Sequence, residues 1–203
     1  MRSEFVSFDS VRDNAIKLAH TIAREWGIPD IIYVSLRGGA AMGNVISEYF
    51  KILAGRKKRV LYAAVVARSY TGMGTAGQVI VDGWTYSPEK LRDGQNVLFI
   101  DDIFDTGQTL NSLVASILDT GIKREHIKIA VHDYKIRQYL SKPHPVLPDY
   151  YCREFVLEKP EDDFWIHYLS HEIESLTGEQ RALHYEKGDP EMKAALLYLE
   201  TNK

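Results

Sequence analysis

The sequence predicts an α/β protein with a central, mostly parallel sheet flanked by helices. Two segments carry this prediction, residues 31–55 and 97–121, because each passes from a short apolar stretch through a glycine-containing turn into an amphipathic helix. Two further apolar stretches, residues 60–67 and 127–131, supply additional strands. Strands that alternate with helices are typical of a parallel sheet, which binds ligands at the carboxyl ends of its strands.

The composition is that of a soluble globular protein. Of the 203 residues 45% are hydrophobic and 26% are charged, which fits a single compact domain. The 25 basic and 28 acidic side chains nearly cancel, so we expect neither nucleic acid nor a membrane surface as a partner. The one cysteine, Cys152, excludes an intrachain disulfide, and no apolar segment approaches about 20 residues. These features predict a cytoplasmic protein.

Apolar residues at helical spacing predict four helices. The first covers residues 7–26 and stops at Gly27. The second and third follow the two glycine turns and end at Gly55 and before Gly121. A final helix begins at Asp189, which is followed by proline. The side chains of this helix that we expect to face inward are Met192, Leu196 and Leu199.

Residues 68–88 interrupt the alternation of strands and helices. Four glycines lie there among serine, threonine and tyrosine, with one strand-like patch at residues 78–81. This composition predicts either a long flexible loop or an excursion hairpin. The basic run at residues 56–59 is interpreted as the solvated beginning of the next strand.

Two adjacent acids, Asp101 and Asp102, follow the apolar residues 97–100, where a buried strand should emerge at the ligand-binding edge. Adjacent carboxylates repel each other, so a ribose diol, with or without Mg²⁺, would suit the pair. Taken alone, such a pair more often merely caps the following loop. The context favours a ligand, because a phosphate-binding turn at a helix start comes three residues later. This turn consists of Asp105, Thr106, Gly107, Gln108 and Thr109.

The stretch VLFIDDIFDTGQTL, residues 97–110, resembles the signature with which type I phosphoribosyltransferases bind 5-phosphoribosyl-1-pyrophosphate (PRPP). The resemblance implies that Asp101 and Asp102 hold the ribose hydroxyls and that the turn binds the 5-phosphate. It makes Asp105 a candidate proton acceptor near N7 of a purine. The implied fold is the type I phosphoribosyltransferase fold, with a flexible catalytic loop and a small hood.

A second glycine turn offers backbone amides and a fixed positive charge, which suit pyrophosphate, although such a turn could simply be a tight connection. It consists of Arg37, Gly38 and Gly39. It resembles the family's pyrophosphate loop, which implies pyrophosphate binding and a strained or cis bond between Leu36 and Arg37. A further segment resembles the start of the catalytic flexible loop in hypoxanthine-guanine phosphoribosyltransferases and implies more pyrophosphate contacts. This segment is Arg68, Ser69 and Tyr70, for which a solvent-exposed hairpin tip is the alternative.

A purine needs a flat partner for its ring and a donor for a carbonyl at position 6. Trp165 and Lys135 would supply these groups, although Trp165 could belong to the core and Lys135 to the surface. Their arrangement resembles that of the 6-oxopurine enzymes. The resemblance implies that Lys135 meets the carbonyl, that Trp165 stacks on the ring and that the backbone of Ile166 contacts its edge. The candidate Mg²⁺ ligands, directly or through PRPP, are Asp101, Asp102 and Glu172.

The resemblance implies a purine phosphoribosyltransferase that transfers the 5-phosphoribosyl group of PRPP to hypoxanthine, guanine or xanthine in purine salvage, with Mg²⁺ as cofactor. It also implies a homodimer or homotetramer. We expect one domain over residues 1–203, with a core at about 28–135, a hood at about 136–175 and a helical extension at about 176–203. Two alternatives stay open. One is a non-catalytic PRPP sensor that binds RNA or DNA, and the other is a phosphoribosyltransferase for adenine or a pyrimidine.

Overall fold

The computed structural model of the protein describes residues 2–70, 78–140 and 144–202. The chain divides into two compact units. The larger unit comprises residues 11–163, and the smaller comprises residues 1–10 together with 164–203. The expected division into core, hood and helical extension remains a prediction.

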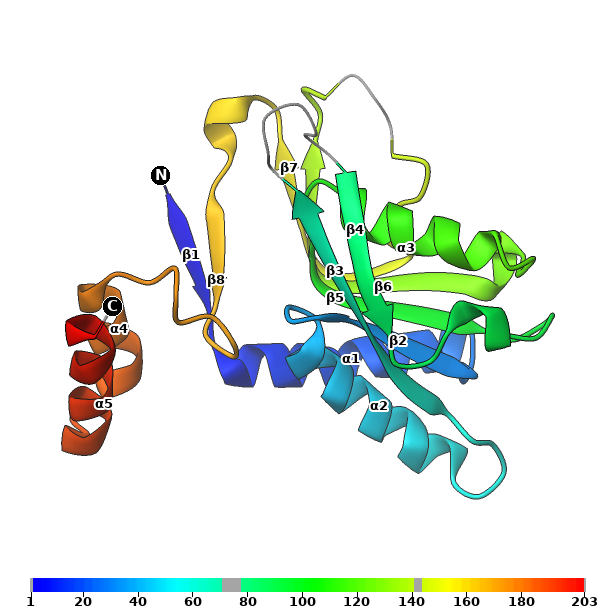
Figure 1. Ribbon diagram of the computed structural model, residues 1–203, viewed down its shortest axis with the longest axis horizontal. Coiled ribbons are helices and arrows are strands. Elements are labelled where there is room, and N and C mark those ends of the chain that lie inside the picture. Colours follow the sequence, from blue (N-terminus) through cyan, green and yellow to red (C-terminus); the bar gives the residue numbers. More distant parts are fainter. Residues whose placement is uncertain (1, 71–77, 141–143, 203) are drawn as a thin grey trace. The chain divides into compact units, whose positions relative to one another are not determined.

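A six-stranded sheet forms the centre of the larger unit (Figure 1). Its strands, in spatial order, are β4 (Gln78–Trp84), β3 (Leu61–Tyr70), β2 (Ile31–Leu36), β5 (Val97–Phe104), β6 (Ile127–Arg137) and β7 (Tyr150–Leu157). All neighbouring strands run parallel except β3 and β4. The predicted α/β class with a mostly parallel sheet is therefore confirmed.

Helices cover both faces of this sheet (Figure 1). The helices are α1 (Phe8–Glu25) and α2 (Ala40–Ala54) on one face and α3 (Gln108–Leu118) on the other. Short 3-10 turns occupy Pro88–Lys90, Arg124–His126 and Pro160–Asp162. No helix in the described part of the chain is long and apolar enough to cross a membrane.

Alternation along the strands gives each face of the sheet its own layer of core. Tyr33 and Phe99 are fully buried and belong to the same apolar cluster as Leu113 of α3. On the opposite face, α2 approaches β2 so closely that a Cβ at Gly43 would lie 2.4 Å from a methyl group of Val34. The glycine thus allows close packing of α2 on the sheet.

Two strands are longer than the apolar runs that predicted them. The predicted strands end at residues 100 and 131, whereas β5 continues to Phe104 and β6 to Arg137. The acid pair therefore lies inside β5 and Lys135 lies inside β6, rather than after the strands. Hydrogen bonds between β5 and β6 persist in this part, with Ile103 opposite Asp133. In this part of β6, Arg153 pairs with Asp133 and Asp163 pairs with Lys135, so charged partners satisfy its polar side chains.

The hairpin alternative for residues 68–88 is the one that the structure contains. Strand β3 continues through Arg68, Ser69 and Tyr70, which pair with β4 in antiparallel register from Ile80 to Gln78. The expected loop start at Arg68 is therefore wrong, because the backbone groups of residues 68–70 pair with β4. Residues 71–77, on which the rest of the predicted flexible loop falls, lie outside the described residues.

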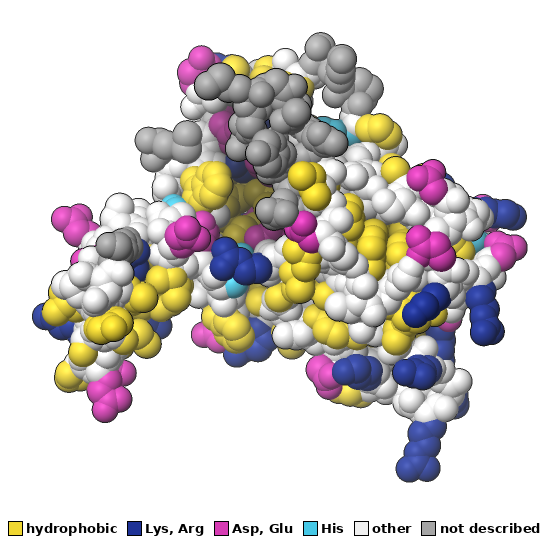
Figure 2. All heavy atoms as spheres, viewed as in Figure 1, with side chains coloured by type: hydrophobic (Ala, Val, Ile, Leu, Met, Phe, Trp, Pro, Cys, Tyr) yellow, Lys and Arg dark blue, Asp and Glu magenta, His cyan; other side chains and the backbone are white. Residues whose placement is uncertain are grey.

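The basic run at residues 56–59 follows α2, and Lys and Arg side chains gather at this loop in Figure 2. Arg56, Lys57 and Arg59 are exposed. Lys58 instead donates to the carbonyl of Ile28 at 2.6 Å and pairs with Asp30 at 3.0 Å. The predicted solvated strand beginning is confirmed apart from this one anchored lysine.

The smaller unit contains the second sheet. Strand β1 (Ser3–Val6) runs parallel to β8 (Trp165–Tyr168). The helices of this unit are α4 (Gly178–Arg181), a π-helical turn (Ala182–Glu186) and α5 (Pro190–Thr201).

Helix α5 begins as predicted, with the Asp189 carboxylate accepting from the backbone N–H groups of Glu191 and Met192. The expected inward face is wrong in part. Leu196 is buried, but Met192 and Leu199 are 38% and 49% exposed. Because α5 packs against the π-helical turn, only a narrow face of the helix is covered.

Candidate active site

The acid pair and the arginine-glycine turn, far apart in sequence, are adjacent in the sheet. Strands β2 and β5 pair in parallel, from Ile31 opposite Val97 to Val34 opposite Ile100, so their carboxyl ends lie side by side. A Cβ built on Gly38 would lie 2.4 Å from Oδ1 of Asp102. One built on Gly39 would lie 2.5 Å from the carbonyl oxygen of Ile100. Glycine at both positions lets the turn contact the end of β5.

Asp101 lies in a setting that opposes its negative charge. It is 9% exposed, and its Oδ1 accepts from the backbone N–H of Asp102 at 3.0 Å. Burial, followed by repulsion from Asp102, raises the pKa of Asp101 well above its usual value, although the Ser35 hydroxyl and the Asp102 N–H partly oppose this. Such a carboxyl group favours a ligand that brings hydroxyl groups or positive charge.

The phosphate turn has the backbone geometry of an anion site. Gly107 has a left-handed conformation with φ of 68°, and it caps α3 without a side-chain hydrogen bond from any described residue. Asn111 holds the turn by donating to the carbonyls of Gly107 at 2.9 Å and of Val146 at 3.0 Å. The first N–H groups of α3 therefore lie at the end of a well-supported turn, where the helix dipole favours negative charge.

A cavity of about 220 Å³ lies between the acid pair and the turn. It is lined by Asp101 and Asp102 on one side and by residues 105–107 and 109 on the other. The structure therefore brings two predicted parts of the site to one cavity. This arrangement can accommodate a phosphorylated sugar, with its hydroxyls on the carboxylates and its phosphate at the helix start.

Lys135 is not on the surface but belongs to a compact cluster of four charges. Its Nζ lies 2.8 Å from Oδ1 of Asp163 and 3.4 Å from Oδ1 of Asp105. Arg137 Nη2 lies 2.5 Å from Oδ1 of Asp105 and 2.8 Å from Oδ2 of Asp163. The surface alternative for Lys135 is therefore wrong, because its side chain is only 5% exposed. The cluster places an ammonium group beside the phosphate turn.

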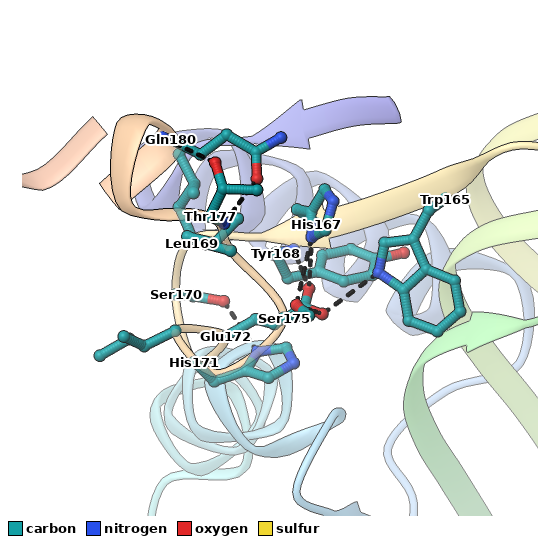
Figure 3. A network of polar contacts seen from close by, with 12 residues as sticks. Trp165, His167, Tyr168, Leu169, Ser170, His171, Glu172, Ser175, Thr177 and Gln180 are labelled. Carbon is teal, nitrogen blue, oxygen red and sulfur yellow. Dashed lines mark hydrogen bonds and ion pairs between the residues drawn. The ribbon is translucent and has the colours of Figure 1, made fainter. Parts of the chain in front are cut away.

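Trp165 lies in the smaller unit, where Glu172 fixes its edge (Figure 3). The indole Nε1–H donates to Oε1 of Glu172 at 3.2 Å. The other oxygen, Oε2, accepts from the backbone N–H of Tyr168 at 3.1 Å and lies 3.5 Å from Nδ1 of His167. Ser175 also donates its hydroxyl to Oε1. Trp165 is nevertheless 50% exposed, so it is an oriented aromatic surface rather than a core residue.

Glu172 is surrounded by donors from its own unit. These contacts favour a role for Glu172 in orienting the indole, rather than the metal-binding role considered from the sequence.

Among the described residues, no group of three or more histidine, cysteine, aspartate or glutamate side chains is arranged to hold a metal ion. Magnesium commonly binds one or two carboxylates and completes its shell with phosphate oxygens and water. Asp101 and Asp102 fit that kind of site.

Comparison with known proteins decides the family. The family model described as Phosphoribosyl transferase domain matches residues 7–171. The chain belongs to this family. It is a PRPP-dependent phosphoribosyltransferase, an enzyme of the pentosyltransferase class. No curated protein matches the sequence at a significant level.

Solved structures share the fold of this phosphoribosyltransferase. A purine phosphoribosyltransferase from Pyrococcus horikoshii is 23% identical with a TM-score of 0.62, covering 87% of this chain and 99% of that one. A hypoxanthine phosphoribosyltransferase from Trypanosoma cruzi in complex with IMP is 20% identical with a TM-score of 0.52, covering 73% and 78%. A hypothetical protein from Neisseria gonorrhoeae with bound ppGpp is 17% identical with a TM-score of 0.58, covering 85% and 91%.

The structure also places residues around the site that the sequence reasoning missed. Ser35 hydrogen-bonds Asp101, and Asn111 supports the phosphate turn. Arg137 and Asp163 complete the charged cluster. Arg137 could have been found, since it lies two residues after Lys135 and strand periodicity puts both on one face. Asp163 had no such signal, because its role depends on the path of the chain after β7.

The resemblance implied a strained or cis bond between Leu36 and Arg37, and the structure contains a cis bond there. The pyrophosphate role of Arg37, Gly38 and Gly39 remains a prediction, as does that of Arg68, Ser69 and Tyr70. The side chains of this second segment lie outside the described residues.

Proposed function

We propose that this phosphoribosyltransferase transfers the 5-phosphoribosyl group of PRPP to a 6-oxopurine, hypoxanthine, guanine or xanthine, in purine salvage. The observation that carries the proposal is the 3.4 Å approach of the Lys135 ammonium to the Asp105 carboxylate beside the phosphate turn. A 6-oxopurine presents a carbonyl oxygen next to the N7–H group on one edge. A donor and an acceptor held this close are complementary to that edge.

The proposed PRPP position follows from the cavity. The 5-phosphate binds the backbone of the turn from Asp105 to Thr109, and the ribose diol binds Asp101 and Asp102. The contact between Gly38 and Asp102 supports a pyrophosphate position against Arg37, Gly38 and Gly39. The end of β3, Arg68, Ser69 and Tyr70, is proposed to meet the same pyrophosphate.

The proposed cofactor is Mg²⁺, held by PRPP oxygens together with the acid pair. The raised pKa of Asp101, which reflects burial and the neighbouring Asp102, supports a bound cation or ribose hydroxyl at this position. Magnesium, when bound with PRPP, supplies positive charge that stabilises the departing pyrophosphate.

In the proposed reaction, the bond between carbon 1 of ribose and pyrophosphate breaks as the purine nitrogen attacks, and carbon 1 acquires oxocarbenium character. Arg37 and the backbone amides of its turn stabilise the anion that leaves. Asp105 accepts the purine N–H proton, and Lys135 donates to the carbonyl oxygen. Trp165 stacks on the ring, and the Ile166 backbone meets its edge. Positioning of the two substrates is the other main catalytic contribution.

A substrate panel tests the proposal. Mg²⁺ and PRPP are incubated with hypoxanthine, guanine, xanthine, adenine, uracil or orotate, and pyrophosphate release is followed. We expect turnover with one or more of the three 6-oxopurines and little with adenine, whose amino group would place a donor against Lys135. Turnover restricted to adenine or a pyrimidine would contradict the proposed acceptor. Absence of turnover with all six bases would contradict the proposed transfer to a purine.

The proposed assembly is a homodimer or homotetramer, and the proposed location is the cytoplasm. Sedimentation equilibrium of the purified chain measures the assembly directly. A mass equal to the 23.2 kDa monomer at micromolar concentration would contradict it.

A further inference from the structure

The cluster of Asp105, Lys135, Arg137 and Asp163 contains two residues to which the proposed reaction gives no role. Arg137 contacts Asp105 and Asp163 contacts Lys135, the two groups that would meet the acceptor base. Lys135 and Arg137 project from the same face of β6, because they are two residues apart in a strand. Their side chains are only 5% and 9% exposed, so both cations need nearby acids.

Asp163 satisfies the two cations with separate oxygens. Its Oδ1 accepts from Lys135 Nζ at 2.8 Å, and its Oδ2 accepts from Arg137 Nη2 at 2.8 Å and Nε at 3.2 Å. Burial opposes ionisation of Asp163, but the hydrogen bonds from Lys135 and Arg137 outweigh it and lower its pKa to about 2. The carboxylate is thus ionised at neutral pH and fixes the spacing of the two cations.

Arg137 in turn fixes Asp105. Its Nη2 donates to Oδ1 of Asp105, and its Nη1 donates to the backbone carbonyl of the same residue. This two-point contact holds both the side chain and the first residue of the phosphate turn. Both ion pairs of the Asp105 carboxylate use Oδ1, and no described residue hydrogen-bonds Oδ2. One oxygen is therefore anchored while the other remains available to an N–H donor.

We propose that Arg137 and Asp163 are positioning residues that set the acceptor specificity of the base site. Asp163 directs the Lys135 ammonium toward the base carbonyl, and Arg137 directs the Asp105 carboxylate toward the adjacent N–H. The acceptor class that this arrangement selects is a heterocycle with a carbonyl next to an N–H on one edge. This inference rests on the proposed function.

Loss of Asp163 has a specific consequence. The Asp105 carboxylate already lies 3.4 Å from the Lys135 ammonium. Lys135 would then pair with Asp105 and occupy the acceptor that the base requires. The site would lose affinity for oxopurines and part of its discrimination against aminopurines, while the PRPP contacts of the acid pair stay in place.

The test compares Asp163→Asn, Asp163→Glu, Arg137→Met and Arg137→Lys with the unaltered enzyme. Asp163→Glu keeps the negative charge and changes only the position of the carboxylate. It therefore keeps the test valid if Asp163→Asn folds poorly. Glu161→Gln, a charge-neutralising change at an exposed acid two residues away, is the matched control. For each variant the KM for hypoxanthine and for PRPP, the kcat, the ratio of kcat/KM for hypoxanthine over adenine, and the melting temperature are measured.

We expect Asp163→Asn and Arg137→Met to raise the KM for hypoxanthine about tenfold and to lower the hypoxanthine-to-adenine ratio by a similar factor. In Asp163→Asn the KM for PRPP should stay within about twofold, because the bonds from Arg137 to Asp105 that hold the phosphate turn remain. Arg137→Met removes these bonds, so it should raise the KM for PRPP as well. Arg137→Lys should restore part of the loss. The Asp163→Asn, Arg137→Met double variant should be little worse than either single one, since the residues act as a unit.

Unchanged base KM and unchanged ratio in the variants would overturn the inference while leaving the proposed function intact. In Asp163→Asn, a parallel rise in both KM values together with a lower melting temperature would also overturn it, since that pattern indicates a purely structural role. No turnover of any 6-oxopurine by the unaltered enzyme would contradict the proposed function, and this inference with it.

Discussion

At the scale of single residues, Asp101 shows how a site can oppose the stability of its own fold. It is a buried carboxyl group next to a second one, and burial followed by the charge of Asp102 raises its pKa. A carboxyl group with a raised folded-state pKa destabilises the fold once the pH exceeds its unfolded pKa of about 3.9. The penalty grows until the folded-state pKa is passed. Asp101 therefore reduces stability at neutral pH.

Asp101→Asn should consequently stabilise the protein and weaken PRPP binding. At pH 7 we expect the free energy of unfolding to rise by about 1 kcal/mol, and this gain to vanish below about pH 4, where the unfolded carboxyl is protonated too. Urea unfolding at pH 7 and pH 4 measures the difference. Asp93→Asn, at an exposed site, is the control. A variant less stable than the unaltered protein at pH 7 would contradict the argument.

Asp105→Asn tests the proposed proton acceptor. An amide keeps the size of the side chain and can still accept from Arg137, but it cannot take a proton from the base. We expect kcat to fall by about 100-fold or more while the KM for PRPP changes little. Steady-state kinetics with hypoxanthine provide the measurement. A kcat equal to that of the unaltered enzyme would show that another group, or water, takes the proton.

At the scale of elements, the sequence predicted the two strand–turn–helix segments more reliably than the residues at which their strands end. Apolar periodicity located α1, α2, α3 and the buried parts of the strands, because that pattern reflects which side chains leave water. It could not locate the ends of β5 and β6. There Asp101, Asp102 and Lys135 are charged, and the partner of Lys135, Asp163, comes from another segment. Strand pairing therefore extends beyond the hydrophobic signal.

The close contact between two elements makes Gly38 a testable position. A Cβ there would lie 2.4 Å from Oδ1 of Asp102, so Gly38→Ala must displace the carboxylate. We expect the KM for PRPP to rise about tenfold, as for loss of one hydrogen bond to a charged group, with a small change in melting temperature. Gly83→Ala is the control, because a Cβ at that position has no atom within 4 Å. If Gly38→Ala and Gly83→Ala had the same KM for PRPP, the position of Asp102 would not matter for PRPP binding.

At the scale of the whole molecule, the predicted site residues are distributed over two units. The acid pair, both glycine turns and Lys135 belong to residues 11–163, whereas Trp165, Ile166 and Glu172 belong to the smaller unit. The sequence signature identified PRPP because one continuous stretch carries it. The aromatic residue depended on a resemblance, since no sequence pattern shows that Glu172 and Ser175 orient it. A motif can be recognised in a sequence, but contacts that depend on the path of the chain cannot.

The pairing of β1 with β8 predicts that the two substrates can be affected separately. Val6 is 3% exposed and lies opposite Tyr168, so Val6→Asp should disturb the strand that carries Trp165. We expect a several-fold higher KM for the purine and an unchanged KM for PRPP. Ile52→Asp, at a position that is 81% exposed in the other unit, is the control. If Val6→Asp raised the KM for the purine and the KM for PRPP equally, the smaller unit would not act on purine binding alone.

The same strand pairing has a practical consequence for anyone who purifies or immobilises this enzyme. The backbone carbonyl of Arg2 accepts from the N–H of Trp165 at 3.1 Å, so the first residues of the chain are bonded to the proposed stacking residue. An affinity tag fused before Arg2 would adjoin the residue that makes this bond. A tag after α5 would follow a helix whose outer side chains are already exposed. Kinetic constants for the purine should therefore be compared between tags at opposite ends before any substitution is interpreted.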